Sequence, residues 1–262
     1  MRLMACRLLL MTVVVALQEF AVRADEPDHP IPAEAREQMR LALRKDVDRL
    51  TESIKQQPDN VDLYSSRGDA LFFLGDFKAA VADYEKMVEL EPDRDASHWR
   101  RGIAQFYAGD FEAAAQQFEK YHSFDDVDRE NGIWRYFSQY RAYGEQKARE
   151  GLLKYRKTDR EPFPSVYKLF SKEPTSNAVL QKVAQADLSD AEREPLSFYA
   201  ELYVGLNEAL EGRDAEAIKH LRLSTASKWG PQAGYGPRYM WHVGRVHYEL
   251  LLNKSQKSKA DQ

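Results

Sequence analysis

Histidines and clustered carboxylates are the residues of this chain that could bind a metal or transfer protons. His242 and His247 stand five positions apart, so on a helix their side chains point roughly 140° apart. That separation excludes the i, i+4 histidine pair of a helical zinc site. The sequence also holds no Gly-x-Ser-x-Gly, Walker A or Gly-x-Gly-x-x-Gly motif. We therefore predict no catalytic residue, no metal site and no cofactor.

A run of acidic residues from Asp125 to Asp128, followed by Gly132, resembles a calcium-binding loop at first sight. Counted from Asp126, the glycine comes one place late for an EF-hand, and the twelfth position holds Phe137 in place of the bidentate glutamate. The better interpretation is a solvated turn between two helical units.

Composition narrows the class of protein without defining an activity. The chain has 262 residues, of which 43% are hydrophobic and 31% charged, and its formal net charge is −4. This balance is typical of a globular protein, and the negative charge argues against a nucleic-acid partner. Cys6 is the one cysteine, which excludes a disulfide framework and any cysteine-ligated metal site.

The first 24 residues have the pattern of a secretory signal peptide. Arg2 and Arg7 precede an apolar run over 8–17, and Val-Arg-Ala stands immediately before Asp25. The order basic, apolar, small-x-small predicts cleavage between Ala24 and Asp25. The apolar run is too short for the roughly 20 residues of a membrane-spanning helix. We expect an exported protein, periplasmic or extracellular, with no transmembrane span after cleavage.

Two further features belong to this end of the chain. The sequence from Leu3 to Cys6 resembles a bacterial lipobox, but it precedes the apolar run, which argues against a lipid anchor. Residues 25–32 read as a flexible linker. Loss of residues 1–24 removes three Arg and one Glu, and changes the formal net charge from −4 to −6.

An internal repeat is the dominant signal of the sequence. The segment 67–80 recurs at 101–114 with nine of fourteen positions identical and an offset of 34 residues. The clear repeats span 61–94 and 95–128, and weaker copies span 129–160 and 198–231. The positions that define the repeat are Gly68, Gly75, Ala80, Tyr84, Pro92, Gly102, Gly109, Ala114 and Phe118.

Each repeat position has a physical role in a pair of packed helices. The first glycine allows two helices to cross closely, and the second ends the first helix at a tight turn. The alanine permits close approach, the aromatic residue fills the space between pairs, and Pro92 separates one repeat from the next. The pattern resembles the tetratricopeptide repeat (TPR). It implies an all-α, right-handed solenoid of antiparallel helix pairs over 33–252, with about four repeats plus flanking helices.

The flanking segments also have helical periodicity. Residues 33–57 form an amphipathic helix in the place of a second helix preceding the first full repeat. We expect further helices over 145–155 and 239–252, and a disordered tail over 253–262. Ser189 and Glu192 form a capping box that opens a long helix ending at Leu210.

A closer resemblance begins in the second clear repeat. Residues 97–109 are similar to the central repeat of the NlpI-type bacterial periplasmic TPR proteins, and the order of the following segments is similar too. That family consists of envelope adaptors that dimerise and bring peptidoglycan hydrolases to partner proteases or synthases. The resemblance therefore implies protein partners in the cell envelope, envelope hydrolases or proteases among them, and a homodimer.

The concave side of the solenoid is the candidate binding surface. An aromatic groove with few charges suits an extended peptide or an amphipathic helix of another protein. Trp99 and Tyr107 are the expected anchors, because Trp and Tyr dominate binding hot spots. Alternatively, the chain's own helix 33–57 or its C-terminal helix covers these aromatic residues, or they pack between repeats. The TPR pattern places in this groove Asp69, Phe72, Trp99, Phe106, Tyr107, Phe137 and Tyr140.

The leading hypothesis is an exported, non-catalytic TPR scaffold that binds other proteins. The carboxylate clamp of chaperone-binding TPRs is argued against, because Ser65 and Asp69 stand where its Lys and Asn would be, and Asp69 repels a chain-end carboxylate. Two alternatives stay open: a self-associating structural TPR protein, and a hydrolase whose carboxylates the sequence does not reveal.

Overall fold

The computed structural model describes residues 29–260, and these contain twelve α-helices and no strand. The expected signal peptide over 1–24 lies outside the described residues, as do 25–28 and 261–262. Of the predicted linker, residues 29–32 are described and they are packed: the His29 ring lies 5.1 Å from that of Tyr248, and Ile31 contacts the hydrophobic core. Residues 29–32 therefore pack against the helices and do not form the flexible linker that we expected.

The first half of the fold is the regular array that the 34-residue repeat predicts. Consecutive helices pack as neighbours along the chain, and a short 3₁₀ helix at Pro92–Arg94 separates the two clear repeats. The proline stands at the start of that turn, where no backbone donor is needed. The helices of this half are α1 (Ala33–Gln56), α2 (Val61–Leu74), α3 (Phe77–Leu90), α4 (Trp99–Ala108), α5 (Phe111–Phe124) and α6 (Arg129–Tyr143).

Helix crossings in the two clear repeats depend on glycine. A Cβ on Gly68 would lie 2.6 Å from the Tyr84 ring, and one on Gly102 would lie 2.7 Å from the Phe118 ring. Gly75 ends α2 in the left-handed region with φ +86°, which L side chains rarely adopt. The glycine and aromatic positions of the repeat thus hold α2 against α3 and α4 against α5.

The third pair departs from the predicted pattern. We expected a helix over 145–155, but α7 (Glu145–Glu150) ends after six residues. The chain then returns to the start of α6, where the Tyr155 hydroxyl donates to the Asp128 carbonyl at 3.0 Å. A Cβ on Gly132 would lie 2.3 Å from that hydroxyl oxygen. Tyr155 therefore packs against α6 from an extended segment, which a helix through 155 would prevent.

The second half returns to paired helices after two short ones, α8 (Phe163–Tyr167) and α9 (Ser176–Ala184). The expected capping box opens α10 (Asp190–Leu210), and α11 (Asp214–Ala226) packs against it. Gly205 repeats the close approach of the clear repeats, with Leu221 in the aromatic position. The weak copy over 198–231 therefore has the same crossing.

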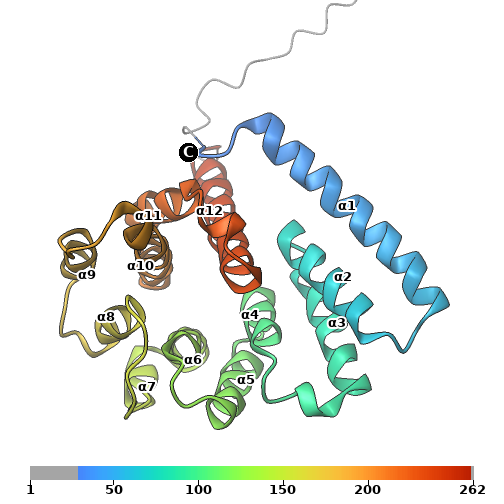
Figure 1. Cartoon of the computed structure of the whole chain (residues 1–262), viewed down its shortest axis with the longest axis horizontal. Coiled ribbons are helices and arrows are strands. Elements are labelled where there is room, and N and C mark those ends of the chain that lie inside the picture. Colours follow the sequence, from blue (N-terminus) through green and yellow to red (C-terminus); the bar gives the residue numbers. More distant parts are fainter. Residues whose placement is uncertain (1–28, 261–262) are drawn as a thin grey trace, which may run out of the picture.

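The last helix, α12 (Tyr235–Ala260), closes the array (Figure 1). The other helices follow a curved path, and α12 lies inside the curve, where it contacts α2, α10 and α11. It begins before the predicted start at 239, because Pro237 fits a first helical turn. It also continues through Ala260, so residues 253–260 are helical and do not form the disordered tail that we expected.

Candidate functional site

The concave groove predicted from the TPR pattern is filled over much of its length by α12. The Phe72 ring is fully buried and stacks on Tyr239 with 5.3 Å between ring centroids. Trp99 meets the same tyrosine edge-on at 4.9 Å. The Tyr107 hydroxyl lies 2.9 Å from Nδ1 of His247. Of the alternatives left open by the sequence, the C-terminal helix is the one that covers these aromatic residues, and their partner-binding role stays a prediction.

Asp69, the charged member of the predicted groove, is engaged within the chain. Its carboxylate accepts from Arg100 at 2.6 Å, from the Tyr84 hydroxyl at 2.7 Å and from the Tyr235 hydroxyl at 2.6 Å. These partners come from α4, α3 and α12. Asp69 therefore ties the closing helix to the first clear repeat.

The remaining predicted groove residues fall into two different places. Phe106 and Phe137 line a cavity of about 240 Å³ beside the later turns of α12, together with Tyr107. Tyr140 lines a separate, polar cavity of about 760 Å³ with Glu208 and His220. The seven predicted residues therefore do not form one continuous open groove.

The histidines considered for chemistry serve packing. The His242 ring stacks on Phe73 at 3.8 Å, and His98 lies with its Nε2 3.4 Å from the sulfur of Met87. Burial lowers the pKa of His98 to about 3 and that of His247 to about 4. These imidazoles are neutral at physiological pH and are buried among aromatic and sulfur atoms.

The acidic turn over 125–128 shapes the start of α6. The Asp125 side chain accepts from the backbone N–H of Val127 at 2.8 Å and of Asp128 at 3.1 Å. The Asp128 side chain accepts from the backbone N–H of Glu130 at 2.9 Å, which makes it the N-cap of α6. In the described part of the chain, no group of three or more His, Cys, Asp or Glu could hold a metal ion.

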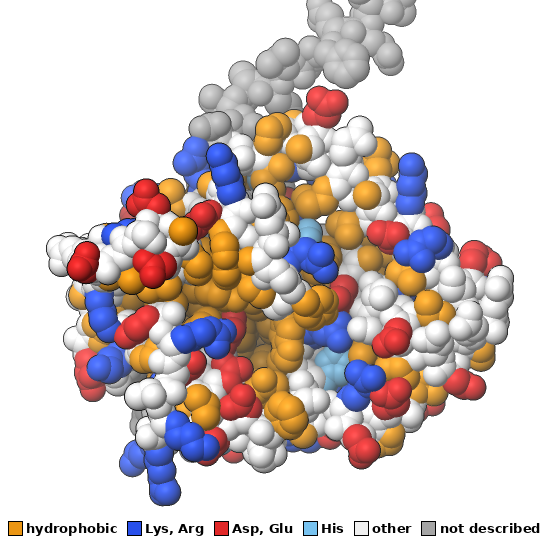
Figure 2. All heavy atoms as spheres, in the orientation of Figure 1, with side chains coloured by type: hydrophobic (Ala, Val, Ile, Leu, Met, Phe, Trp, Pro, Cys, Tyr) orange, Lys and Arg blue, Asp and Glu red, His pale blue; other side chains and the backbone are white. Residues whose placement is uncertain are grey.

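A second cavity on the concave side, of about 360 Å³, lies beside the first turns of α12. We call it the acidic aromatic pocket. Figure 2 shows one face of the molecule, with hydrophobic side chains gathered in a hollow near its middle. The pocket joins residues that are far apart in the sequence. Its lining includes Trp99, Tyr121, Asp128, Glu130, Asn131, Trp134, Arg160, Tyr199, Trp229 and Met240.

Glu130 is the central ionisable group of this pocket. The Tyr203 hydroxyl donates to its carboxylate, and an Arg160 Nη lies 3.9 Å away. Its side chain is 18% exposed. Burial, aided by the nearby carboxylate of Asp128, raises the pKa of Glu130 to about 8. Burial likewise raises the pKa of Asp128 above its usual range.

Asn131 adds an unsatisfied acceptor to the same wall. It is only 3% exposed, and its Nδ2 donates to the Phe118 carbonyl at 3.3 Å. Its Oδ1 is buried without a hydrogen-bond partner in the described structure. A buried acceptor left unpaired costs about 1–3 kcal/mol, so such atoms are rare in native proteins. Asn131 lines the pocket, and its Oδ1 is the one buried oxygen there that the described chain leaves without a donor.

The first and second helices of the repeats are joined by a different charged cluster, for which we predicted no function. Arg67, Arg101 and Arg135 recur every 34 residues, and we call them the arginine ladder. Each one bonds a group sixteen residues later in the chain and another sixteen residues earlier. The side-chain pairs are Arg67 with Asp83 and Thr51, Arg101 with Gln117 and Glu85, and Arg135 with Glu119 and the Gly151 carbonyl.

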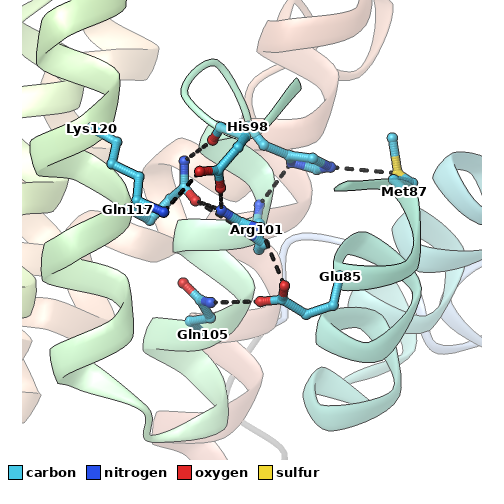
Figure 3. Close-up of polar contacts among 8 residues, drawn as sticks. Glu85, Met87, His98, Arg101, Gln105, Gln117 and Lys120 are labelled. Atoms are coloured by element: carbon cyan, nitrogen blue, oxygen red, sulfur yellow. Dashed lines mark hydrogen bonds and ion pairs between the residues drawn. The ribbon is translucent and has the colours of Figure 1, made fainter. Parts of the chain in front are cut away.

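Figure 3 shows the middle rung of this ladder. Arg101, from α4, lies between α3 and α5 and donates to Gln117 at 2.8 Å and to Glu85 at 3.2 Å. It also pairs with Asp95, which accepts from Lys120 at 2.8 Å. The signal for this cluster was present in the sequence, because the arginine is one of the nine identical positions.

Comparison with known protein families identifies the array. The tetratricopeptide repeat family matches residues 32–94 and 65–126, which hold α1 to α5. A search of curated proteins returned no match to the chain. Within 29–260, no helix has both the length and the apolar composition needed to span a bilayer. Residues 32–126 match the tetratricopeptide repeat, and residues 29–260 as a whole have an all-α fold consistent with a tetratricopeptide repeat solenoid.

Proposed function

We propose that this chain is an exported, non-catalytic TPR scaffold that binds another protein in the cell envelope with its concave side. TPR arrays mostly bind proteins, and this one presents a cavity on its concave side that α12 leaves open. That open cavity beside α12 is the observation that carries the proposal. Trp99, one of the two predicted anchors, lines it.

The export part of the proposal rests on residues 1–24. Their basic start, apolar run and Val-Arg-Ala before Asp25 predict cleavage by a signal peptidase. Fractionation of cells that make the protein, followed by mass spectrometry of its N-terminus, tests this step. We expect an exported chain that begins at Asp25. A cytoplasmic chain that retains residues 1–24 would contradict it.

The binding part is tested by capture from native envelope extract. The bait is the intact chain, compared with Trp99→Ala and with the control Phe124→Ala, which removes a 65% exposed aromatic residue outside the pocket. We expect proteins that the wild-type chain and Phe124→Ala both retain and that Trp99→Ala loses. Equal recovery with all three baits would remove the concave side from the proposal.

Self-association is a second candidate, favoured by a groove between α1 and α12. This groove has a volume of about 830 Å³ and is lined by Met39, Leu43 and Leu250, and Leu41 on the same helix α1 is 41% exposed. Sedimentation equilibrium distinguishes the two candidates. A dimer that Leu43→Glu converts to a monomer would support self-association, and a monomer at all accessible concentrations would exclude it.

A further inference from the structure

We propose that the acidic aromatic pocket receives a lysine or arginine side chain from the protein that the concave side binds. This inference rests on the proposed function and specifies the chemistry of the partner. It draws on three features of the pocket: its aromatic walls, its excess of carboxylate oxygens and its unpaired buried acceptor.

The walls of the pocket suit the long, partly apolar side chain of a basic residue. Trp99, Trp134 and Trp229 line it with Tyr121 and Tyr199. Aromatic faces attract ammonium and guanidinium groups, and the stem of a Lys or Arg side chain packs on apolar surface. The cavity volume of about 360 Å³ lies within the range of about 300–1,000 Å³ typical of ligand sites.

At a pH above about 8, where Glu130 is ionised, its carboxylate is only weakly compensated by cations of the chain. Glu130 and Asp128 line the pocket. Asp159 does not line it, but its side chain, 6% exposed, lies near enough to raise the pKa of both. The nearby cation, Arg160, is 3.9 Å from Glu130 and 3.7 Å from Asp159, and its side chain is 63% exposed. One largely solvated guanidinium shared between two carboxylates compensates them weakly. The positive charge of a bound Lys or Arg side chain would compensate the carboxylate that Arg160 leaves only weakly paired.

The oxygen atoms of the pocket can also accept hydrogen bonds from a bound molecule. Asp128 is engaged in capping α6, and the Tyr203 hydroxyl satisfies part of the Glu130 carboxylate. The Oδ1 of Asn131 has no partner in the described structure. Lysine brings three N–H donors and arginine five, and neither brings an acceptor. A basic side chain would therefore bring donors to the carboxyl group of Glu130 and to the wall that carries Asn131.

Binding of a cation is coupled to the proton on Glu130. Asp128 and Asp159 disfavour the charged form of Glu130, Arg160 and the Tyr203 hydroxyl favour it, and burial outweighs these two. With a pKa of about 8 the group is mostly protonated at pH 7. A cation favours the carboxylate, so binding releases a proton and strengthens as the pH rises from 6 to 9.

Calorimetric titration of the intact chain with small probes tests this inference without a protein partner. The probes are Nα-acetyl-lysine amide, Nα-acetyl-arginine amide and, as the uncharged match, Nα-acetyl-norleucine amide. At pH 9 we expect the two basic probes to bind at least about tenfold more tightly than the norleucine probe, as expected for a charge-assisted hydrogen bond. In buffers of different ionisation enthalpy at pH 7, their binding should release a proton.

The Glu130→Gln variant keeps the shape of the side chain and removes its charge. We expect it to weaken the basic probes at least about tenfold at pH 9 and to abolish proton release. The matched control Glu112→Gln, at an exposed position of α5, should bind like the wild type. Equal binding of all three probes, or unchanged binding and proton release in Glu130→Gln, would overturn the inference.

A second measurement on the wild-type chain does not depend on the variant folding. The indole N–H signals of Trp99, Trp134 and Trp229 should shift in NMR spectra when the lysine probe is added, and stay in place with the norleucine probe. Identical shifts with both probes would overturn the inference. If capture of a protein partner depends on Trp99 while the basic probes fail to bind, the proposed function stands and only the basic side chain is wrong.

Discussion

The arginine ladder and the acidic aromatic pocket both place charge between helices, but they leave it in different states. Arg101 has a side chain 6% exposed, and Gln117, Glu85 and Asp95 surround its guanidinium. Glu130, 18% exposed, has one tyrosine hydroxyl and a solvated arginine at 3.9 Å. The chain surrounds the charged group of the first cluster with hydrogen-bond partners, and it gives the carboxyl group of the second cluster fewer of them.

The difference separates a cluster that stabilises the fold from one for which we propose a binding role. A buried charge is tolerated when it is paired and hydrogen-bonded, as it is along the ladder. Where the chain leaves a buried carboxylate and an amide oxygen without full partners, a ligand can supply them. The ladder joins the first helix of each repeat to the second helices on either side of it. The pocket lies on the concave side, where we propose that a partner binds. Each prediction below tests one part of this contrast.

The largest effect is expected at Tyr239, on the helix that forms one wall of the pocket. It is 1% exposed and packs against Phe72 and Trp99. Tyr239→Ala should lower the free energy of unfolding by about 3–5 kcal/mol, because it opens a large cavity in the core. Urea denaturation measures the loss. The exposed control Tyr143→Ala should change stability by at most about 0.5 kcal/mol, and an equally small effect at Tyr239 would mean that α12 does not fill the groove in solution.

Breaking the middle rung of the ladder should have the next largest effect. Arg101→Met leaves Asp95 and the buried Gln117 without their shared donor. We expect a loss of about 2–4 kcal/mol in the free energy of unfolding. Arg49→Met removes an exposed pair with Asp46 and should cost no more than about 0.5 kcal/mol. If the two variants lose the same amount, the ladder is not a structural element.

Removing the charge in the pocket should change how stability depends on pH. Glu130 has a pKa of about 8 in the folded chain against an ordinary value of 4.5, so the folded state holds its proton more tightly. The wild type should lose stability as the pH rises from 5 to 9, and Glu130→Gln should lose less. We expect the two curves to diverge by about 2–4 kcal/mol between pH 5 and pH 9, because each unit of pKa shift is worth about 1.4 kcal/mol and solvent screens part of it. Parallel stability–pH curves would show that Glu130 ionises normally.

The smallest effect is expected at the start of the ladder. The Thr51 hydroxyl on α1 accepts from Arg67 at 3.1 Å. Thr51→Ala should cost about 0.5–1.5 kcal/mol, the net value of one hydrogen bond. Thr51→Ser, which keeps the hydroxyl, is the matched control. A loss shared equally by both variants would exclude the hydrogen bond as the cause.

Much of the array was predictable because its contacts are local and periodic. The 34-residue offset located the helices of both clear repeats, and the crossings of Gly68 with Tyr84 and of Gly102 with Phe118 follow from it. The arginine ladder could have been predicted for the same reason. Its partners lie sixteen residues away, at a fixed distance along the repeat.

The position of the closing helix α12 and the lining of the pocket could not be predicted from the repeat period. The Phe72 contact with Tyr239 spans most of the chain, and no periodicity relates the two residues. The pocket combines Trp99, Glu130 and Met240 from three separate helices. The early end of α7 depends on where Tyr155 packs. In each case long-range packing decides the structure, and a single sequence does not record it.

The most direct test of the contrast is the pKa of Glu130 itself, measured by NMR titration of its side-chain carboxyl carbon. The structure predicts a value of about 8 for the chain alone. With saturating Nα-acetyl-lysine amide, the pKa should fall by at least about one unit, because the bound cation favours the carboxylate. A pKa near the ordinary 4.5, or one that the lysine probe leaves unchanged, would contradict the account.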